Sequence, residues 1–455
     1  MSIVNRDMTK KDIRKKIYAM IIPVIGENIL QMTVGLVSMA MISRISNTAV
    51  AAQGICSLII GIAWSLFKGL SLGGTVLVAK AYGAGDTDKL ERVVQQTMIS
   101  SFILVLILQQ VIYWHAGAIL SIFNPKPNVM AHAIGYIRTV SFGLPFLSIV
   151  LNVNGALQGM GNTKTPLMIT TILNLVNIAL GYILIFGILG FNGMGLKGAA
   201  VALISAQFIS SLCALYIVFG KDGILRNMRN TSFFKLQIKQ VGEIFNIGIP
   251  SGFETIFWQL ASIILGRVIL SFGEVSYAAN QLGLQAESIS EMPALGFGLA
   301  ATALTGQALG AMNKKLGKEY IKEISKGAIL VISIGIIILL FFPHVAMRLL
   351  TDDEEVIRLG AIYLRLMGLV QIPQNLQRVF TGAIKGAGFT KIPMLIAGIG
   401  LWGIRVPAAL ILTKYFHLSI ISIWIVVCID QTLRFILSYI IYKKKNIFKE
   451  AASDL

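Results

Sequence analysis

Charged residues are scarce in this sequence. Only 13% of its 455 residues are Asp, Glu, Lys or Arg, whereas 55% are hydrophobic. Soluble domains carry about 25% charged residues, so this chain has too little polar surface to coat a body that faces water. The composition excludes a sizeable soluble domain.

Cysteine and histidine are also rare. The three cysteines fall in separate apolar segments, and the four histidines are scattered. This distribution excludes a disulfide framework and offers no metal-ligand spacing. The stretch 193–198 reads G-x-G-x-x-G, but no βαβ unit surrounds it, and no phosphate-binding loop or catalytic triad signature appears. We therefore expect no enzyme, no ATP-driven pump, no metal site and no cofactor.

Apolar runs of about 20 to 30 residues recur along the chain, and each is long enough to cross a hydrocarbon layer of about 30 Å as a helix. They show no alternation of polar and apolar residues, which argues against an outer-membrane barrel. We predict an all-α polytopic membrane protein with twelve transmembrane helices. The predicted spans are 15–43, 49–79, 92–116, 128–152, 164–189, 195–220, 242–271, 276–309, 319–343, 356–380, 391–414 and 418–443.

Basic residues give the chain a net charge of +18, and they are unevenly distributed between the predicted loops. Most lie in segments on the same side as the N-terminus. The opposite side holds only Arg44, Lys126, Lys197, Arg348, Arg358 and Lys414. This positive-inside bias predicts a multi-pass protein of the cytoplasmic membrane with both termini in the cytoplasm. No compact basic module suggests nucleic-acid binding.

One twelve-residue stretch occurs twice. Residues 155–166 read GALQGMGNTKTP, and residues 382–393 read GAIKGAGFTKIP, 227 positions later. The same offset places Glu27 on Glu254. One six-helix unit is therefore used twice, which predicts a parallel repeat with substrate and ion sites near the membrane midplane and alternating access between two lobes.

The repeat divides the chain into an N-terminal lobe (1–220), a linker (221–240) and a C-terminal lobe (241–455). The linker is basic with scattered apolar residues, and suits either an interfacial strap on the membrane or a solvated loop. No signal for a symmetric oligomer is present, so we expect a monomer in the lipid bilayer.

Each copy of the repeated motif contains a Gly-x-x-x-Gly pair, a glycine that ends the helix and a proline that opens the next span. These residues are Gly155, Gly159, Gly161 and Pro166 in the first half and Gly382, Gly386, Gly388 and Pro393 in the second. Small residues allow helices to approach closely in lipid, so a structural role is favoured over substrate contact.

Two pairs of motifs resemble those of a known family. AKAYGAGD (79–86) and TGQALGAMN (305–313) end the second span of each half, and the two glycine motifs end the fourth. Together with twelve spans in two halves, they resemble the MATE family of multidrug and toxic compound extrusion transporters. The resemblance covers nearly the full length. It implies efflux of small organic, often cationic, compounds driven by H⁺ or Na⁺, and a V-shaped pair of six-helix bundles.

Polar residues inside the spans are the candidate site residues, because a carboxylate at the bilayer centre costs about 2.5–3.5 kcal/mol. Glu27, Gln31 and Ser38 share one helical face. The other candidates are Glu254 and Trp258 in the seventh span, Asn280, Glu287 and Glu291 in the eighth, and Gln371 and Asn375 in the tenth. Burial and a second nearby carboxylate both favour the protonated carboxyl form. We therefore expect ion coupling or substrate binding at these residues. Asp430 and Arg434, spaced i,i+4, suit a structural pair.

The coupling ion stays open between H⁺ and Na⁺. Many family members carry an aspartate where this chain has Ser38, so Glu27 would have to replace it. An alternative function is a flippase for a lipid-linked or anionic amphipathic substrate, since Lys68, Arg267, Arg378, Lys385 and Arg405 could form a cationic cavity. The gapless duplication argues against a receptor, and the lack of a signal for a symmetric oligomer argues against a channel.

Overall fold

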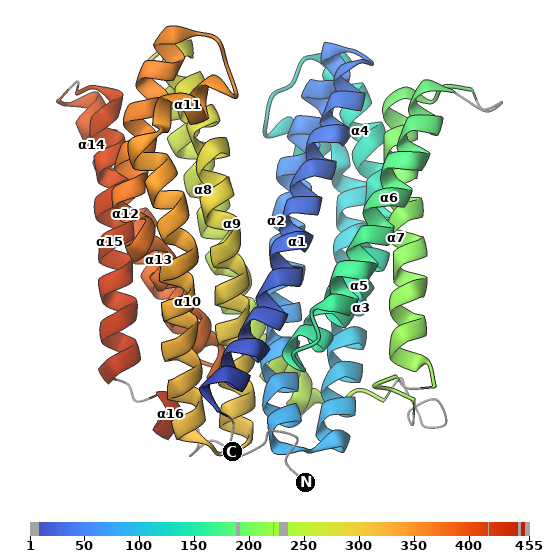
Figure 1. Ribbon diagram of the computed structural model, residues 1–455. Helices are drawn as coiled ribbons and strands as arrows, with labels where there is room; N and C mark the ends of the chain where they lie inside the picture. The colour runs from blue at the N-terminus through green and yellow to red at the C-terminus, as the bar shows by residue number, and fades with distance from the viewer. Residues whose placement is uncertain are drawn as a thin grey trace. The chain divides into compact units, whose positions relative to one another are not determined.

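Helices account for all the regular structure in the described part of the chain. The computed structural model describes residues 9–187, 192–221, 223–226, 235–416, 418–444 and 447–450. Figure 1 shows long helices joined by short connections. In the first half they are α1 (Lys10–Ser43), α2 (Asn47–Ala84), α3 (Thr87–Ser121), α4 (Pro127–Ser141), α5 (Leu144–Gly159), α6 (Lys164–Phe186) and α7 (Gly195–Phe219).

The second half repeats this order with more interruptions. Its helices are α8 (Ile238–Leu270), α9 (Glu274–Gly310), α10 (Lys314–Phe341), α11 (Pro343–Arg348), α12 (Glu354–Gly386), α13 (Lys391–Gly398), the π-helix η2 (Ile399–Arg405), α14 (Val406–Lys414), α15 (Ile420–Lys444) and α16 (Ile447–Glu450).

The predicted spans correspond to these helices with two differences. Ten helical segments of the described residues are long and apolar enough to cross a membrane, and the pair α4 and α5, bent by 48°, makes an eleventh. The predicted span 128–152 is thus broken near Pro145, a residue that cannot continue the hydrogen-bond ladder of the preceding helix. Helix α9, which contains the predicted span 276–309, is 37 residues long but is not among these segments.

The chain forms two compact units. Unit 1 contains Met1–Ile25, Tyr82–Gly85 and Phe253–Leu455, and unit 2 contains Gly26–Ala81 and Asp86–Gly252. Helices α1 and α8 each continue from one unit into the other, and the two division points are 227 residues apart, the offset of the repeat. The lobes predicted from the repeat alone stay a prediction, and much of the predicted linker (222 and 227–234) lies outside the described residues.

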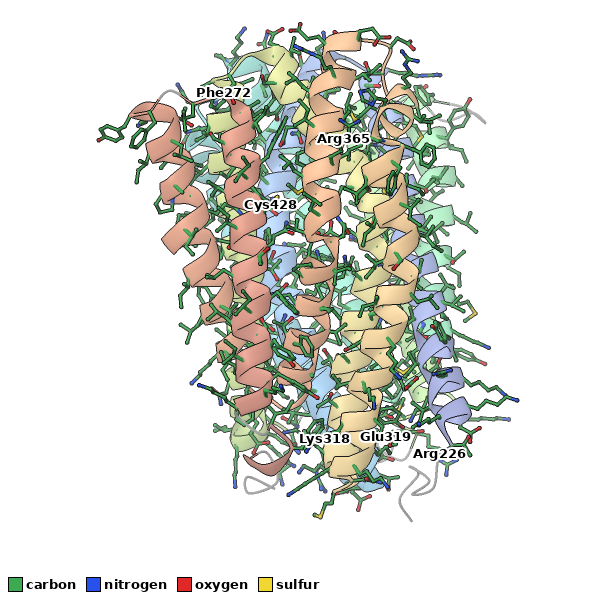
Figure 2. All side chains as sticks on the ribbon, turned by 60° about the vertical axis from the view of Figure 1, so that its left-hand side comes forward. Arg226, Phe272, Lys318, Glu319, Arg365 and Cys428 are labelled. Atoms are coloured by element: carbon green, nitrogen blue, oxygen red, sulfur yellow. The ribbon has the colours of Figure 1, made fainter. Side chains whose placement is uncertain are left out.

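The first turns of α1 contribute to the core of unit 1. Ile13 and Ile17, one helical turn apart, are buried in a cluster with Phe297 and Tyr320. Beside them, Arg14 Nε lies 2.7 Å from Glu323 Oε2. In Figure 1, α1 begins and α15 ends at the same end of this unit. Figure 2 shows Lys318 and Glu319 at that end, Phe272 at the other, and Cys428 between them.

The glycines of the repeated motif lie where two helices touch. A Cβ atom on Gly155 would overlap the hydroxyl of Ser71 in α2, and a Cβ atom on Gly382 would overlap the backbone oxygen of Gly298 in α9. Ser71 and Gly298 are themselves 227 residues apart. The same helix crossing is therefore built once in each unit.

The corner after each motif is also shared. Gly161 and Gly388 have φ angles of +90° and +98°, in the left-handed region that favours glycine. The next helices begin at Lys164 and Lys391, so that Pro166 and Pro393 lie in their first turns. Proline fits there because the first amide groups of a helix have no partner within it.

Candidate functional site

Glu287 lies at the centre of a buried polar network in unit 1. Its side chain projects from α9 and is 4% exposed. Tyr363 donates its hydroxyl to Glu287 Oε2 at 2.6 Å, and Gln371 Nε2 donates to Oε1 at 3.2 Å. Both donors come from α12 and are neutral. The carboxyl group is thus bound by hydrogen bonds that do not require it to be charged.

Further amide and hydroxyl groups orient Gln371. Ser290 donates its hydroxyl to Gln371 Oε1 at 3.1 Å. Asn375 Nδ2, one turn further along α12, lies 3.1 Å from the same oxygen and 2.6 Å from the Gln371 backbone oxygen. Both amide side chains are fully buried. The sequence-predicted residues Glu287, Gln371 and Asn375 therefore come together in one network.

Three carboxylates of unit 1 are bonded by α12 residues spaced seven apart. Gln371 binds Glu287, Arg378 forms an ion pair with Glu291, and Lys385 pairs with Glu254. Seven residues are close to two helical turns, so these side chains share one face of α12 at intervals of about 10 Å. The carboxylates thus have a graded set of partners, from a neutral amide to a guanidinium and an ammonium.

The ion pair between Lys385 and Glu254 uses both carboxylate oxygens. Lys385 Nζ lies 2.9 Å from Oε2 and 3.1 Å from Oε1. The two side chains are 20% and 14% exposed, so the pair is mostly but not fully covered. Glu254 therefore does not join the Glu287 network.

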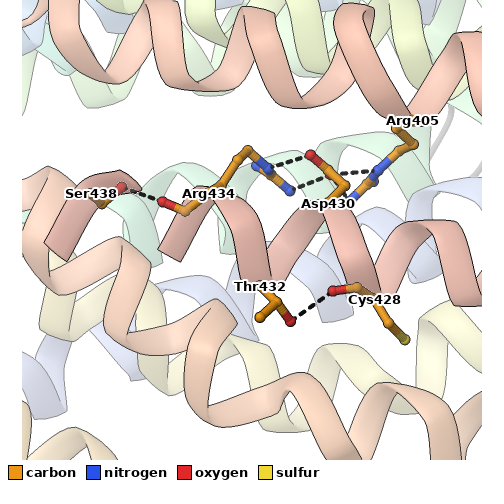
Figure 3. Close-up of polar contacts among 6 residues, drawn as sticks. All are labelled: Arg405, Cys428, Asp430, Thr432, Arg434 and Ser438. Carbon is orange, nitrogen blue, oxygen red and sulfur yellow. Dashed lines mark hydrogen bonds and ion pairs between the residues drawn. The ribbon is translucent and has the colours of Figure 1, made fainter. Parts of the chain in front are cut away.

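A second charged cluster in unit 1 combines one carboxylate with two guanidinium groups (Figure 3). Asp430 Oδ2 lies 2.6 Å from Arg405 and 3.0 Å from Arg434, and all three side chains are at most 7% exposed. Both guanidinium groups also stack near the ring of Trp258, at 5.0 and 4.5 Å from its centre. The predicted pair of Asp430 and Arg434 is therefore a triad with one excess positive charge.

The π-helix η2 makes room for this triad. Arg405 is its last residue, and Gly400, one turn earlier, faces the other two members. A Cβ atom on Gly400 would overlap Asp430 Oδ1 and lie within 3 Å of the Arg434 side chain. Short π-helical segments frequently occur at functional sites. The local backbone and the missing side chain together allow two arginines to share one aspartate.

Glu27 occupies a separate site in unit 2. It is 9% exposed, and Thr170 of α6 donates its hydroxyl to Oε1 at 3.0 Å. Ser38 accepts a long contact of 3.5 Å from Asn177 Nδ2, whereas Gln31 is exposed. The three residues of the predicted stripe therefore differ in burial, and only Glu27 is buried.

Among the described residues, Asn280 forms a hydrogen bond with a tryptophan and none with a carboxylate. Its Oδ1 accepts a hydrogen bond of 3.0 Å from Trp424 Nε1, and both side chains are buried. The sequence did not identify Tyr363 and Thr170 as site residues. Tyr363 matches Tyr136 across the repeat, which was a usable signal, but nothing in the sequence distinguishes Thr170 from other hydroxyl residues.

Comparison with known proteins identifies what the chain is similar to. The MatE family model matches residues 23–183 and 250–411, once in each half. A "Probable multidrug resistance protein NorM" of Thermotoga maritima is 29% identical over 428 residues, 93% of this chain and 90% of that protein. A "Probable multidrug resistance protein YoeA" of Bacillus subtilis is 24% identical, covering 98% and 97% of the two chains.

Solved structures show the same fold. A "MATE in the bent conformation" superposes with a TM-score of 0.88 at 21% identity, covering 98% of both chains. A "MOP superfamily transporter from Pyrococcus furiosus" superposes with a TM-score of 0.84 at 21% identity, covering 95% of this chain and 96% of that one. The predicted all-α fold with two repeated lobes is confirmed.

Proposed function

Since the chain belongs to the MatE family of multidrug efflux transporters, we propose that it is an antiporter that exports small organic cations in exchange for H⁺ or Na⁺ by alternating access. As a multi-pass membrane protein, it would lie in the cytoplasmic membrane with both termini in the cytoplasm. We expect it to act as a monomer.

The Glu287 network carries this proposal. A buried carboxylate within a membrane protein needs a reason, because unpaired charge is expensive there. The groups that bind Glu287 are a tyrosine hydroxyl and an amide, so gain or loss of a proton or cation changes the charge of the site without first breaking an ion pair. The same oxygen-rich group of Glu287, Gln371 and Ser290 suits Na⁺ as well.

Glu27 supports the same role in unit 2. It is a second buried carboxyl group with a neutral hydroxyl donor, Thr170. Glu254 and Glu291 already have basic partners, so each would need to release Lys385 or Arg378 before binding another cation. The ring of Trp258 is stacked with two arginines, and we assign no substrate contact to it.

The second candidate function is movement of an anionic amphipathic substrate. One observation favours it: Arg405 and Arg434 share a single carboxylate and leave one excess positive charge. The Pyrococcus furiosus structure is described as having "reverse polarity of binding pocket". Against this function, Arg378 and Lys385 are both paired with glutamates.

Transport by the purified full-length protein in liposomes tests the proposal. We expect an imposed pH or Na⁺ gradient to drive uptake of tetraphenylphosphonium, a lipophilic monocation, and E287Q and E27Q to lower that uptake by about tenfold or more, as loss of a coupling carboxylate should. E274Q, at the exposed start of the same helix α9, is the matched control and should transport like wild type. Gradient-driven movement of an anionic amphipathic dye, with none of the cation, would replace this function with the second candidate.

A further inference from the structure

The two repeat-related glutamates have hydrogen-bond partners of different charge. Glu27 and Glu254 are 227 residues apart and hold equivalent places in α1 and α8. Glu27 accepts a hydrogen bond from the Thr170 hydroxyl, whereas Glu254 is bound through both oxygens by the Lys385 ammonium group. The repeat has thus kept the carboxylate and changed its hydrogen-bond partner, while Lys68 also interacts with Glu27 electrostatically.

Each half supplies only its own partner. The position equivalent to Lys385 in the first half is Gln158, and the position equivalent to Thr170 in the second half is Ala397. Neither half could therefore form the contact of the other. The lysine at position 385 is a specific feature of the second half and is not a requirement of the glycine motif that surrounds it.

The backbone around Lys385 packs closely against α9. Gly382 and Gly386 flank the lysine, and Cβ atoms on them would overlap the backbone oxygens of Gly298 and Thr302. The flexible stem of the lysine can therefore release Glu254 while this helix contact stays in place. Because the pair is 20% and 14% exposed, another cation can approach it.

Arg378 also interacts electrostatically with Glu254, but it forms an ion pair with Glu291. Lys385 is therefore the basic group that binds Glu254 directly through both oxygens. A lysine ammonium group is a compact charge on a long flexible chain, and so it can be exchanged more easily than a two-pronged guanidinium.

We infer that Lys385 competes with the substrate for Glu254: the lysine pairs with the carboxylate until an organic monocation displaces it. The inference rests on the proposed function, since it requires a transported cation. The lysine keeps Glu254 neutralised while no substrate is bound, and its release makes the carboxylate a temporary partner for the substrate. Lys385 acts through Glu254 and is a positioning residue.

Two substitutions at position 385 should change the apparent affinity for tetraphenylphosphonium in opposite directions. K385Q installs the residue of the first half and removes the competitor, so the KM should fall by about tenfold. K385R keeps the charge and binds a carboxylate through two donors, so the KM should rise by several fold, roughly threefold or more. K391Q changes the exposed lysine of the same motif and should leave the KM unchanged.

A purely structural lysine would give a different result. K385Q would then lower the melting temperature and the maximal rate without lowering the KM, and K385R would restore wild-type behaviour. Either outcome in a wild-type protein that transports the cation overturns the inference alone. If K385Q does not accumulate, an unchanged KM in K385R overturns it. Failure of the wild-type protein to move the cation overturns the proposed function and this inference together.

Discussion

Tyr363 donates its hydroxyl to Glu287 over 2.6 Å, and this contact exists in only one half of the repeat. The equivalent tyrosine of the first half, Tyr136, is also buried, but Ile60 stands where Glu287 would be. The scaffold residue is therefore duplicated while the carboxylate is not. Comparing the two tyrosines therefore distinguishes the role of Tyr363 in packing from its role at Glu287.

Removing the Tyr363 hydroxyl should impair transport. Y363F takes away the shortest hydrogen bond of Glu287, and hydrogen bonds to charged groups contribute about 1.5–3 kcal/mol. We expect gradient-driven cation uptake in liposomes to fall by about tenfold. Y136F is the matched control. Equal losses of uptake in Y363F and Y136F would show that the hydroxyl serves packing and not the Glu287 site.

The sequence predicted the carboxylates but not their partners. The depth of Glu27, Glu254 and Glu287 in their spans follows from hydropathy and repeat position. Their partners lie far away along the chain: Thr170 is 143 residues from Glu27, and Lys385 is 131 residues from Glu254. Contacts of this kind depend on the rotation of each helix about its axis, and apolar composition all round a membrane helix leaves that rotation undetermined.

Local backbone irregularities were also beyond the sequence. Nothing in residues 391–414 distinguishes a continuous span from three segments with a central π-helix. The structure shows why the irregularity is there, since Gly400 and Arg405 meet Asp430 across the helix interface. The repeat, by contrast, was fully visible, and with it the two glycine crossings at Gly155 and Gly382.

The Thr170 hydroxyl should matter only in the presence of Glu27. T170V is nearly isosteric and removes the donor to the carboxylate. We expect it to lower cation uptake by about threefold to tenfold, in line with a hydrogen bond of about 1 kcal/mol or more. T171V is the control, because Thr171 bonds Leu167 within its own helix.

A double-mutant cycle checks this assignment. In the E27Q background, T170V should produce no further loss of uptake, since the two residues act through one contact. A loss of the same size with and without Glu27 would contradict it.

The charge triad should make Asp430 more important for stability than Arg405. D430N removes the carboxylate that two buried guanidinium groups share, and removing one partner of a buried ion pair costs about 3–5 kcal/mol. R405Q leaves a one-to-one pair between Asp430 and Arg434, so its cost should be clearly smaller. Thermal unfolding in detergent measures both. Equal destabilisation by the two variants would mean that the excess positive charge is neutralised by a group outside the triad.

Alanine substitutions in the repeated motif should destabilise the protein by different amounts at the two helix crossings. A Cβ atom at position 382 would overlap the backbone oxygen of Gly298, which cannot move without shifting α9. At position 155 the two closest atoms are the side-chain hydroxyls of Ser71 and Thr75, which can rotate, and the backbone oxygen of Ser71 lies further away at 3.1 Å. Overpacking typically destabilises a protein by about 1–3 kcal/mol. The loss of stability in G382A should therefore be at or above the upper end of this range, and that in G155A near the lower end.

G54A is the control, since a Cβ atom at position 54 would meet nothing within 4 Å and alanine is a better helix former than glycine. Melting temperatures in the order G54A, G155A, G382A from highest to lowest would establish backbone contact as the reason for the second glycine motif, whereas equal values for G155A and G382A would assign both glycines to chain flexibility.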